Sequence, residues 1–304
     1  MKSHNCIYIL TILTMVAAWV ATGCAGAPSE QPIVTVSIEP QRYILEQITG
    51  DRVQVRSLLT EGANPETYDP SVTHMHNLGN SLGYLRMGNI GFEVALIDKI
   101  REANPDLKIF DTSAGVVPIT GTHSHGDGHE HETVDPHTWT SVKNVKVIAS
   151  NMLEAMGIID PSNSSYYRRN YETFATRLDS IDSLITVRLA PVKGASFMVW
   201  HPSLSYFARD YGLNQIVVGN ADHKESSIAD LRGAIDDARN HGAGIFFFQK
   251  DFDSRQVSAI NAELEACEVS INPLTYQWED EIIKIADSIA SKAVAPHDGQ
   301  DKTE

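Results

Sequence analysis

Residues 160 to 191 read DPSNSSYYRRNYETFATRLDSIDSLITVRLAP and carry the longest helical pattern in the chain. Asp160 and Pro161 are a typical N-cap and first helical residue, and Pro191 ends the pattern. A helix of about thirty residues is roughly 45 Å long, so we expect it to span two lobes; the alternative is one long core helix of a single domain. Its apolar residues recur in steps of four and three, at Tyr167, Tyr171, Phe174, Leu178, Ile181, Ile185 and Leu189.

Strand-like and helix-like segments alternate on both sides of this helix. Repeated strand, helix, strand units with short links imply an α/β fold with two lobes, each a largely parallel sheet flanked by helices, joined by the long helix. The predicted N-terminal lobe covers 32–159, the linking helix 160–190 and the C-terminal lobe 191–295. The predicted strands are 34–38, 53–59, 84–87, 107–110, 196–200, 215–218, 245–248 and 268–271, and the predicted helices are 41–48, 71–78, 92–103, 204–211, 228–239, 255–266 and 279–293.

The first residues have the layout of a secretory signal, predicted over 1–23. A short polar start precedes an apolar run from Ile7 to Val20, which is too short to span a bilayer comfortably. Small residues then lead into Cys24, as in a bacterial lipobox with a lipidated cysteine; the alternative is an ordinary signal peptide cut nearby. Residues 24–31 would form a lipidated tether that holds the protein on a membrane surface, and 296–304 a disordered tail.

Cysteine usage and charge agree with an exported protein. Cys6 leaves with the signal and Cys24 takes the lipid, so Cys267 stands alone and no intramolecular disulfide is available. The formal charge is -15, and loss of Lys2 with the signal makes it -15 - 1 = -16. An acidic surface argues against nucleic acid and anionic lipid as partners, and it is compatible with attracting cations.

The tract from Gly121 to Trp139 reads GTHSHGDGHEHETVDPHTW and holds five of the twelve histidines. Imidazole is the commonest nitrogen ligand of zinc, and histidines mixed with Gly, Ser, Asp and Glu give a flexible, solvated tract that can wrap a divalent ion. Metal binding is therefore the first hypothesis. The alternatives are a fortuitous polar loop or a tag scar, although a tag is a terminal run of uninterrupted histidines.

Three loops place further donors at the ends of predicted strands, where ligands of parallel sheets bind. Glu66 lies between two prolines, His137 follows the His-rich tract, and His201 ends the strand 196–200. Each alone is ordinary, as a solvated loop acid or a structural histidine. Together they bring donors from both lobes to one ion. Two imidazoles and a carboxylate bind zinc, with a fourth donor or water, but they also suit iron or manganese.

With these residues, the chain resembles the metal-binding lipoproteins of bacterial ABC importers for zinc and manganese, the ZnuA and TroA group of periplasmic solute-binding proteins. The resemblance covers essentially the whole mature chain, from Val34 to Ala293. A loop rich in His and acids before the second ligand motif resembles the zinc-specific branch. The matching segments are VSIEP at 36–40 with Tyr43 and Gly50-Asp51, residues 62–70, NIGFE at 89–93, DPHTW at 135–139, Asp160-Pro161 with Tyr167, HPSLSYF at 201–207 with YGL at 211–213, and ESS at 225–227.

The resemblance implies two α/β lobes joined by one long helix, with the ion in the cleft between them and limited opening and closing. The family's histidine ligands correspond to His137 and His201. This chain departs at two positions, where Glu66 replaces a histidine and Asn272 replaces an aspartate. The two exchanges keep a single negative charge among the ligands. We therefore predict Glu66, His137 and His201 as core ligands, with Asn272, Gln249 or water as a weaker fourth.

Apart from His4 in the predicted signal, the remaining histidines fall into two groups. Those in the tract predict a weaker accessory site that gathers zinc and hands it to the cleft; the alternative is disorder with incidental metal affinity. The others are predicted surface residues. The accessory group is His123, His125, His129 and His131, and the surface group is His74, His76, His223, His241 and His297.

The predicted function is a non-enzymatic carrier, the substrate-binding component of an ABC importer, with Zn²⁺ as the favoured ion and Mn²⁺ or Fe²⁺ as alternatives. It requires a permease and an ATPase as partners, because the chain has no transmembrane segment after the signal and no phosphate-binding Gly-rich loop. We expect a monomer, lipid-anchored on the periplasmic side of the cell envelope. The other candidates are a zinc metallohydrolase, which would lack the usual His-Glu-x-x-His helix, and a metal-binding surface adhesin on the same fold.

Overall fold

The computed structural model describes residues 31–59, 63–65, 68–124, 130–218, 228–249 and 260–293, and from Pro32 onward these belong to one structural unit. Within these ranges, no helix is long and apolar enough to cross a membrane. Several predicted features lie outside the described residues: the signal peptide, Cys24 and the tether up to residue 30, the tail 296–304, Glu66, His125, His129, His223 and His297.

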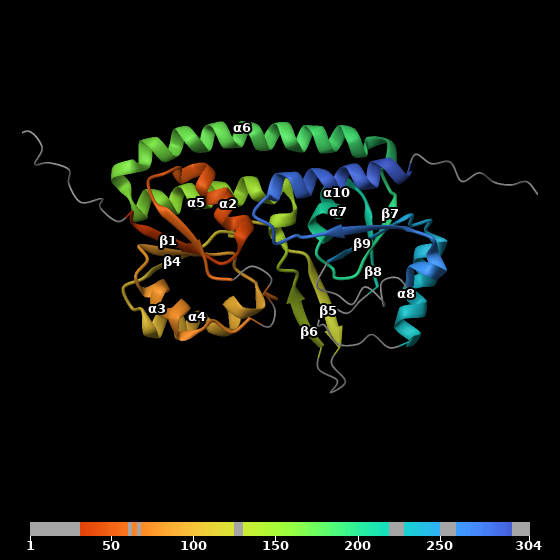
Figure 1. The fold of residues 1–304 in the computed structure, drawn as a ribbon, viewed down its shortest axis with the longest axis horizontal. Helices are drawn as coiled ribbons and strands as arrows, with labels where there is room; N and C mark the ends of the chain where they lie inside the picture. The colour runs from red at the N-terminus through yellow and green to blue at the C-terminus, as the bar shows by residue number, and fades with distance from the viewer. Residues whose placement is uncertain are drawn as a thin grey trace, which may run out of the picture. The chain divides into compact units, whose positions relative to one another are not determined.

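The N-terminal half contains a four-stranded parallel sheet in the order β2-β1-β3-β4. Val34 and Val36 of the inner strand β1 are fully buried, and Thr35 on its opposite face is 4% exposed, as expected for a strand covered on both faces. Helices α2 and α5 lie over one face, and α3 and α4 lie on the other (Figure 1). The elements are β1 (Ile33–Val36), α2 (Glu39–Thr49), β2 (Gln54–Ser57), α3 (Val72–Gly79), β3 (Gly83–Arg86), α4 (Gly91–Ala103), β4 (Lys108–Asp111) and α5 (Val142–Ile159).

The C-terminal half repeats this plan with a second four-stranded parallel sheet, in the order β10-β9-β7-β8. Helix α10 packs against β9 and β10, while α8 packs against β7 and β8. These two parallel sheets confirm the predicted α/β class. The elements are β7 (Ser196–Val199), α7 (Ser205–Tyr211), β8 (Asn214–Val217), α8 (Ile228–Asn240), β9 (Ile245–Gln249), β10 (Cys267–Ile271) and α10 (Trp278–Ala293).

The long helix α6 (Ser164–Leu189) connects the halves, with short 3-10 turns at Pro161–Asn163 and Ala190–Val192. Its 26 residues are about 39 Å long. It packs against α2 and α5 at one end and against α10 at the other (Figure 1), which confirms the predicted span. Six of the seven predicted apolar positions are buried, and Tyr171 is half-buried. Because these side chains contact both halves, one hydrophobic core runs from the N-terminal sheet along α6 to α10 and the C-terminal sheet.

Asp160 is the N-cap of the 3-10 turn that leads into α6, and Pro161 follows it as predicted, but its side chain makes no capping hydrogen bond. Its carboxylate accepts hydrogen bonds from the side chains of Ser162, Asn163 and Tyr167, at 2.6, 2.7 and 2.6 Å. Burial raises the pKa of this carboxyl, but the hydrogen bonds outweigh burial and the net shift is downward. Asp160 therefore ties the first turns together through side chains and is ionised at neutral pH.

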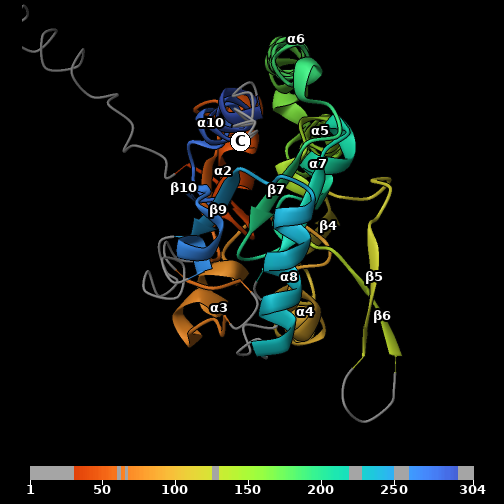
Figure 2. The ribbon, with the colours of Figure 1, turned by 90° about the vertical axis from the view of Figure 1, so that its right-hand side faces the viewer.

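Two elements were absent from the sequence prediction. One is α5, whose buried residues Val145, Ile148 and Met152 follow helical spacing. The other is an antiparallel hairpin of β5 (Thr120–Ser124) and β6 (Glu130–Val134), which forms the flanks of the tract predicted to be flexible. Several β-branched residues in these flanks favour extended backbone. Figures 1 and 2 show the hairpin extending away from both sheets.

Candidate metal site

The predicted donors of the C-terminal half lie at one edge of its sheet. Gln249 is the last residue of β9, Asn272 follows β10, and His201 comes two residues after β7. The parallel register pairs Val199 with Phe247 and Ile271 with Gln249, so the carboxyl ends of these strands meet at this edge. Ligands of open α/β sheets bind at such edges.

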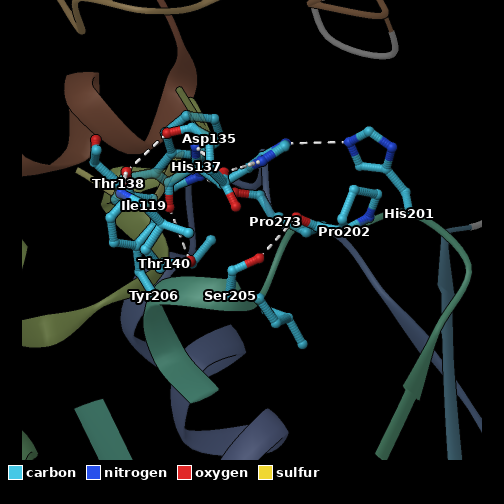
Figure 3. A network of polar contacts seen from close by, with 12 residues as sticks. Ile119, Asp135, His137, Thr138, Thr140, His201, Pro202, Ser205, Tyr206 and Pro273 are labelled. Atoms are coloured by element: carbon cyan, nitrogen blue, oxygen red, sulfur yellow. Dashed lines mark hydrogen bonds and ion pairs between the residues drawn. The ribbon is translucent and has the colours of Figure 1, made fainter. Parts of the chain in front are cut away.

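His137 and His201 meet across the two halves. Their Nε2 atoms are 3.1 Å apart, and their ring centroids lie 5.0 Å apart at an angle of 77° (Figure 3). Both side chains are nearly buried, with 5% and 7% of their surface exposed. The structure therefore brings together two of the predicted ligands, although they are 64 residues apart in the sequence.

Asp135 orients the His137 ring from behind. One carboxylate oxygen accepts hydrogen bonds from the backbone N–H of His137 at 2.9 Å and from Nδ1 of its ring at 2.8 Å. Burial raises the pKa of Asp135, but the hydrogen bonds and charge of His137 and the Ser205 hydroxyl lower it further than burial raises it. An ionised carboxylate only accepts hydrogen bonds, so Nδ1 of His137 donates to it, and Nε2 is the ring nitrogen that faces His201.

The backbone around His137 is held by residues of both halves. Trp139 packs beside the His137 ring with centroids 5.3 Å apart, and its indole N–H donates to the carbonyl of Pro273 at 2.8 Å. In return, the indole N–H of Trp278 donates to the carbonyl of Trp139 at 2.8 Å. The hydroxyl of Thr140 donates to the carbonyl of His137 at 2.9 Å. These contacts limit the movement of His137 relative to the C-terminal half.

Of the other three predicted ligands, the structure describes Asn272 and Gln249 but not Glu66. Asn272 is exposed, and its side-chain oxygen accepts a hydrogen bond from the backbone of Leu274 at 3.1 Å. Gln249 is half-buried. Glu66 lies outside the described residues, but its neighbour Pro65 accepts a hydrogen bond from the N–H of Phe92 at 3.4 Å. Across the described ranges, no group of three or more His, Cys, Asp and Glu side chains converges on one point.

The accessory histidines are described only in part. His123 and His131 are partners in the register of the hairpin, while His125 and His129 lie outside the described residues. Among the predicted surface histidines, His76 and His241 are exposed. His74 is half-buried, and its ring is 2.6 Å from the hydroxyl of Tyr68.

Two residues of the site were missed at the sequence level. Asp135 was noted only as part of the motif around His137, although an acid two residues before a histidine is a usable signal for an orienting partner. Tyr206 donates a hydrogen bond to the carbonyl of Asp135 at 2.8 Å across 71 residues of sequence, and no local pattern predicts that contact.

The fold and the histidine pair define a two-lobed binding protein with metal-type donors where the lobes meet. Residues 34–291 match the model of the family described as ZnuA, zinc-uptake complex component A, periplasmic, so the chain belongs to this family. A putative metal-binding protein of Chlamydia trachomatis is 26% identical over 258 residues, covering 85% of this chain and 90% of that protein.

Two further similarities agree with this assignment. The zinc-binding lipoprotein AdcA of Streptococcus pneumoniae is 23% identical over 287 residues, covering 90% of this chain and 56% of AdcA. Among solved structures, a crystal structure of ZnuA aligns with a TM-score of 0.77 at 31% sequence identity, covering 86% of this chain and 99% of that chain.

Proposed function

We propose that this protein is the substrate-binding component of an ABC importer, which captures Zn²⁺ between its lobes and delivers it to a membrane permease. The observation that carries the proposal is the 3.1 Å separation of the Nε2 atoms of His137 and His201. Two nitrogens bound to one tetrahedral zinc at about 2.0–2.1 Å lie roughly 3.3 Å apart. The pair is therefore spaced for zinc with little movement.

The donor set also favours zinc. Imidazole nitrogen is a better ligand for zinc than for harder ions such as magnesium or calcium, and Asp135 holds the His137 ring in a fixed orientation. Glu66 would complete the core set from the loop after β2, with Asn272, Gln249 or water in the fourth position. Manganese and iron accept the same donors, so they are the ions to compete against zinc.

The proposal extends to the partners, the location and the accessory histidines. The permease and ATPase subunits of the importer are the proposed partners, and the chain itself is proposed to act as a non-enzymatic monomer. Lipid on Cys24 would anchor it at the periplasmic side of the cell envelope. The accessory histidines His123, His125, His129 and His131 would gather zinc near the cleft.

The decisive experiment is metal analysis of the purified protein, followed by competition among Zn²⁺, Mn²⁺ and Fe²⁺. We expect one tightly bound zinc per chain, retained against equal concentrations of the other ions. The variants His137→Ala and His201→Ala should lose it. Unchanged zinc retention in both variants would show that His137 and His201 are not the ligands. Preferential manganese binding would show that the transported ion is manganese, and the proposed carrier function would still hold.

Catalysis is tested separately with the zinc-loaded protein and generic peptide and ester substrates. We expect no turnover above that of the His201→Ala variant. Turnover that depends on His137 and His201 would assign a metallohydrolase instead.

A further inference from the structure

The last rung of the β5–β6 hairpin is built in an unusual way. The register pairs Thr120 with Val134, so Ile119 and Asp135 form the next pair along the ladder. The N–H of Asp135 donates to the carbonyl of Ile119 at 2.9 Å, as in a hydrogen-bonded antiparallel pair. In such a pair the N–H of Ile119 would normally donate back to the carbonyl of Asp135.

The hydroxyl of Tyr206 stands in place of this second bond. It accepts from the N–H of Ile119 at 3.1 Å and donates to the carbonyl of Asp135 at 2.8 Å. Figure 3 shows Tyr206 and Ile119 on the side of His137 away from His201. Tyr206 is fully buried, and burial raises the pKa of its phenol, so the hydroxyl keeps its proton and can both donate and accept.

Helix α7 holds the base of the hairpin at a second point. The guanidinium of Arg209 lies 5.0 Å from the centre of the Tyr206 ring, and it donates to the carbonyl of Val117 at 2.9 Å. Both contacts come from the C-terminal half, whereas Val117, Ile119 and Asp135 precede the long helix. The hairpin base is therefore fixed to the half that supplies His201.

The hydrogen bond between Tyr206 and Asp135 connects the two histidines. On one side, Asp135 carries the carboxylate that binds the ring of His137 at 2.8 Å. On the other side, Tyr206 is the second residue of α7, five residues after His201. A shift of the Tyr206 hydroxyl would therefore move His137 relative to His201 and alter the end of the hairpin at the same time.

We propose that Tyr206 is a positioning residue that couples the β5–β6 hairpin to the histidine pair. It acts through Asp135 and touches no ion itself. The proposal rests on the proposed zinc-binding function for its effect on affinity. Because coupling between two sites is reciprocal, zinc at the histidine pair must also stabilise the last rung of the hairpin.

The test is Tyr206→Phe, which removes one oxygen and keeps the ring against Arg209. We expect zinc affinity to fall about tenfold, at the low end of the range for residues that orient metal ligands. The amide of Ile119 should exchange with solvent deuterium faster in the metal-free variant. Zinc should slow this exchange in the wild type and slow it much less in the variant.

The matched control is Tyr211→Phe on the same helix, whose hydroxyl bonds Asp182 at 3.0 Å. This change should leave zinc affinity and exchange at Ile119 unaltered. Equal effects of the two variants would indicate a general loss of stability and overturn the proposal. Wild-type zinc affinity and Ile119 exchange in Tyr206→Phe would overturn it as well.

Two further measurements separate the role of Tyr206 from the proposed zinc-binding function. In the metal-free protein, the ¹⁵N resonances of the His137 ring should change in Tyr206→Phe and stay unchanged in Tyr211→Phe. If the wild type bound no zinc, the proposed function would fail, and these resonances together with exchange at Ile119 would still decide the role of Tyr206. In the wild type alone, absence of zinc-dependent protection at Ile119 would refute the coupling.

Discussion

The two halves of the molecule meet in two different ways. The aromatic junction is formed by Tyr43 and Glu46 of α2, by Tyr276 two residues before α10, and by Trp278 at the start of α10. The ring of Tyr43 packs edge to face against Tyr276 and is stacked with Trp278, with centroids 5.5 and 6.4 Å apart. The hydroxyl of Tyr276 donates to the carboxylate of Glu46 at 2.5 Å. At the histidine junction, by contrast, the ring nitrogens of His137 and His201 face each other at 3.1 Å.

The two junctions differ in the interactions that hold them together. The aromatic junction buries apolar area and joins a donor to an acceptor, so it stabilises the contact by itself. The histidine junction instead places the Nε2 atoms of two imidazoles against each other, where either a shared proton or a cation can join them. We infer that the first fixes how closely the halves approach and that the second detects the ion. Variants of each junction should therefore change different quantities.

The largest effect is expected for Trp278→Ala at the aromatic junction. Trp278 is 2% exposed and its indole N–H donates to Trp139, so the variant leaves a cavity and an unpaired carbonyl. We expect a loss of about 3–5 kcal/mol in the free energy of unfolding, measured by urea titration in the presence of a chelator. The control is Val187→Ala, at a position 73% exposed, with an expected change within about 0.5 kcal/mol. A loss of under about 1 kcal/mol for Trp278→Ala would show that the aromatic junction does not fix how closely the halves approach.

The next effect is expected for His201→Ala and falls on zinc binding. Removing a ligand should weaken zinc affinity by more than about 100-fold, beyond the effect typical of residues that only orient ligands. Zinc at 100 times its dissociation constant should raise the wild-type free energy of unfolding by about 2.7 kcal/mol, and this gain should vanish in the variant. Calorimetry gives the affinity and urea titration gives the gain. A variant that kept the gain would place zinc elsewhere.

Asp135→Asn should have a smaller effect on the same quantity. The amide keeps the shape of the carboxylate but removes its charge, so the His137 ring loses its ionic partner. We expect zinc affinity to fall about tenfold at fixed pH, with little change in the free energy of unfolding of the metal-free protein. Asp98→Asn is the matched control, because its side chain is 87% exposed and far from the histidines in sequence. Equal affinities for the two variants would exclude an orienting role for Asp135.

Much of the fold was predictable because its signals are local. The strand β1 is a short buried apolar run, and α6 places its buried residues at regular helical spacing. Helix α5 carries the same kind of signal in Val145, Ile148 and Met152, so the sequence was sufficient to predict it as well. The β5–β6 hairpin differs, because its polar sequence is typical of a loop and its strands are defined only by pairing with each other.

The site was predictable only as far as residue type and strand ends allow. His137 and His201 each follow a predicted strand or motif, so their pairing across the lobes could be proposed from sequence. The contact of Tyr206 with Ile119 and Asp135 depends on how α7 packs against the hairpin base, over 87 and 71 residues of sequence. Such distances are set by tertiary packing, and single-sequence patterns do not encode them.

The smallest effect is expected for Tyr276→Phe, and it separates the junctions by pH. Loss of the hydrogen bond to Glu46 should cost about 1 kcal/mol of unfolding free energy at neutral pH and leave zinc affinity unchanged. Burial and the bond to Glu46 raise the pKa of Tyr276 from 10.0 to about 12. The folded protein therefore holds this proton more tightly than the unfolded chain, so the contribution is present below pH 10 and is lost as pH rises toward 12. In urea titrations across this window, the wild type should lose more stability than Tyr276→Phe, and parallel losses would show that the tyrosine proton plays no part in holding the halves together.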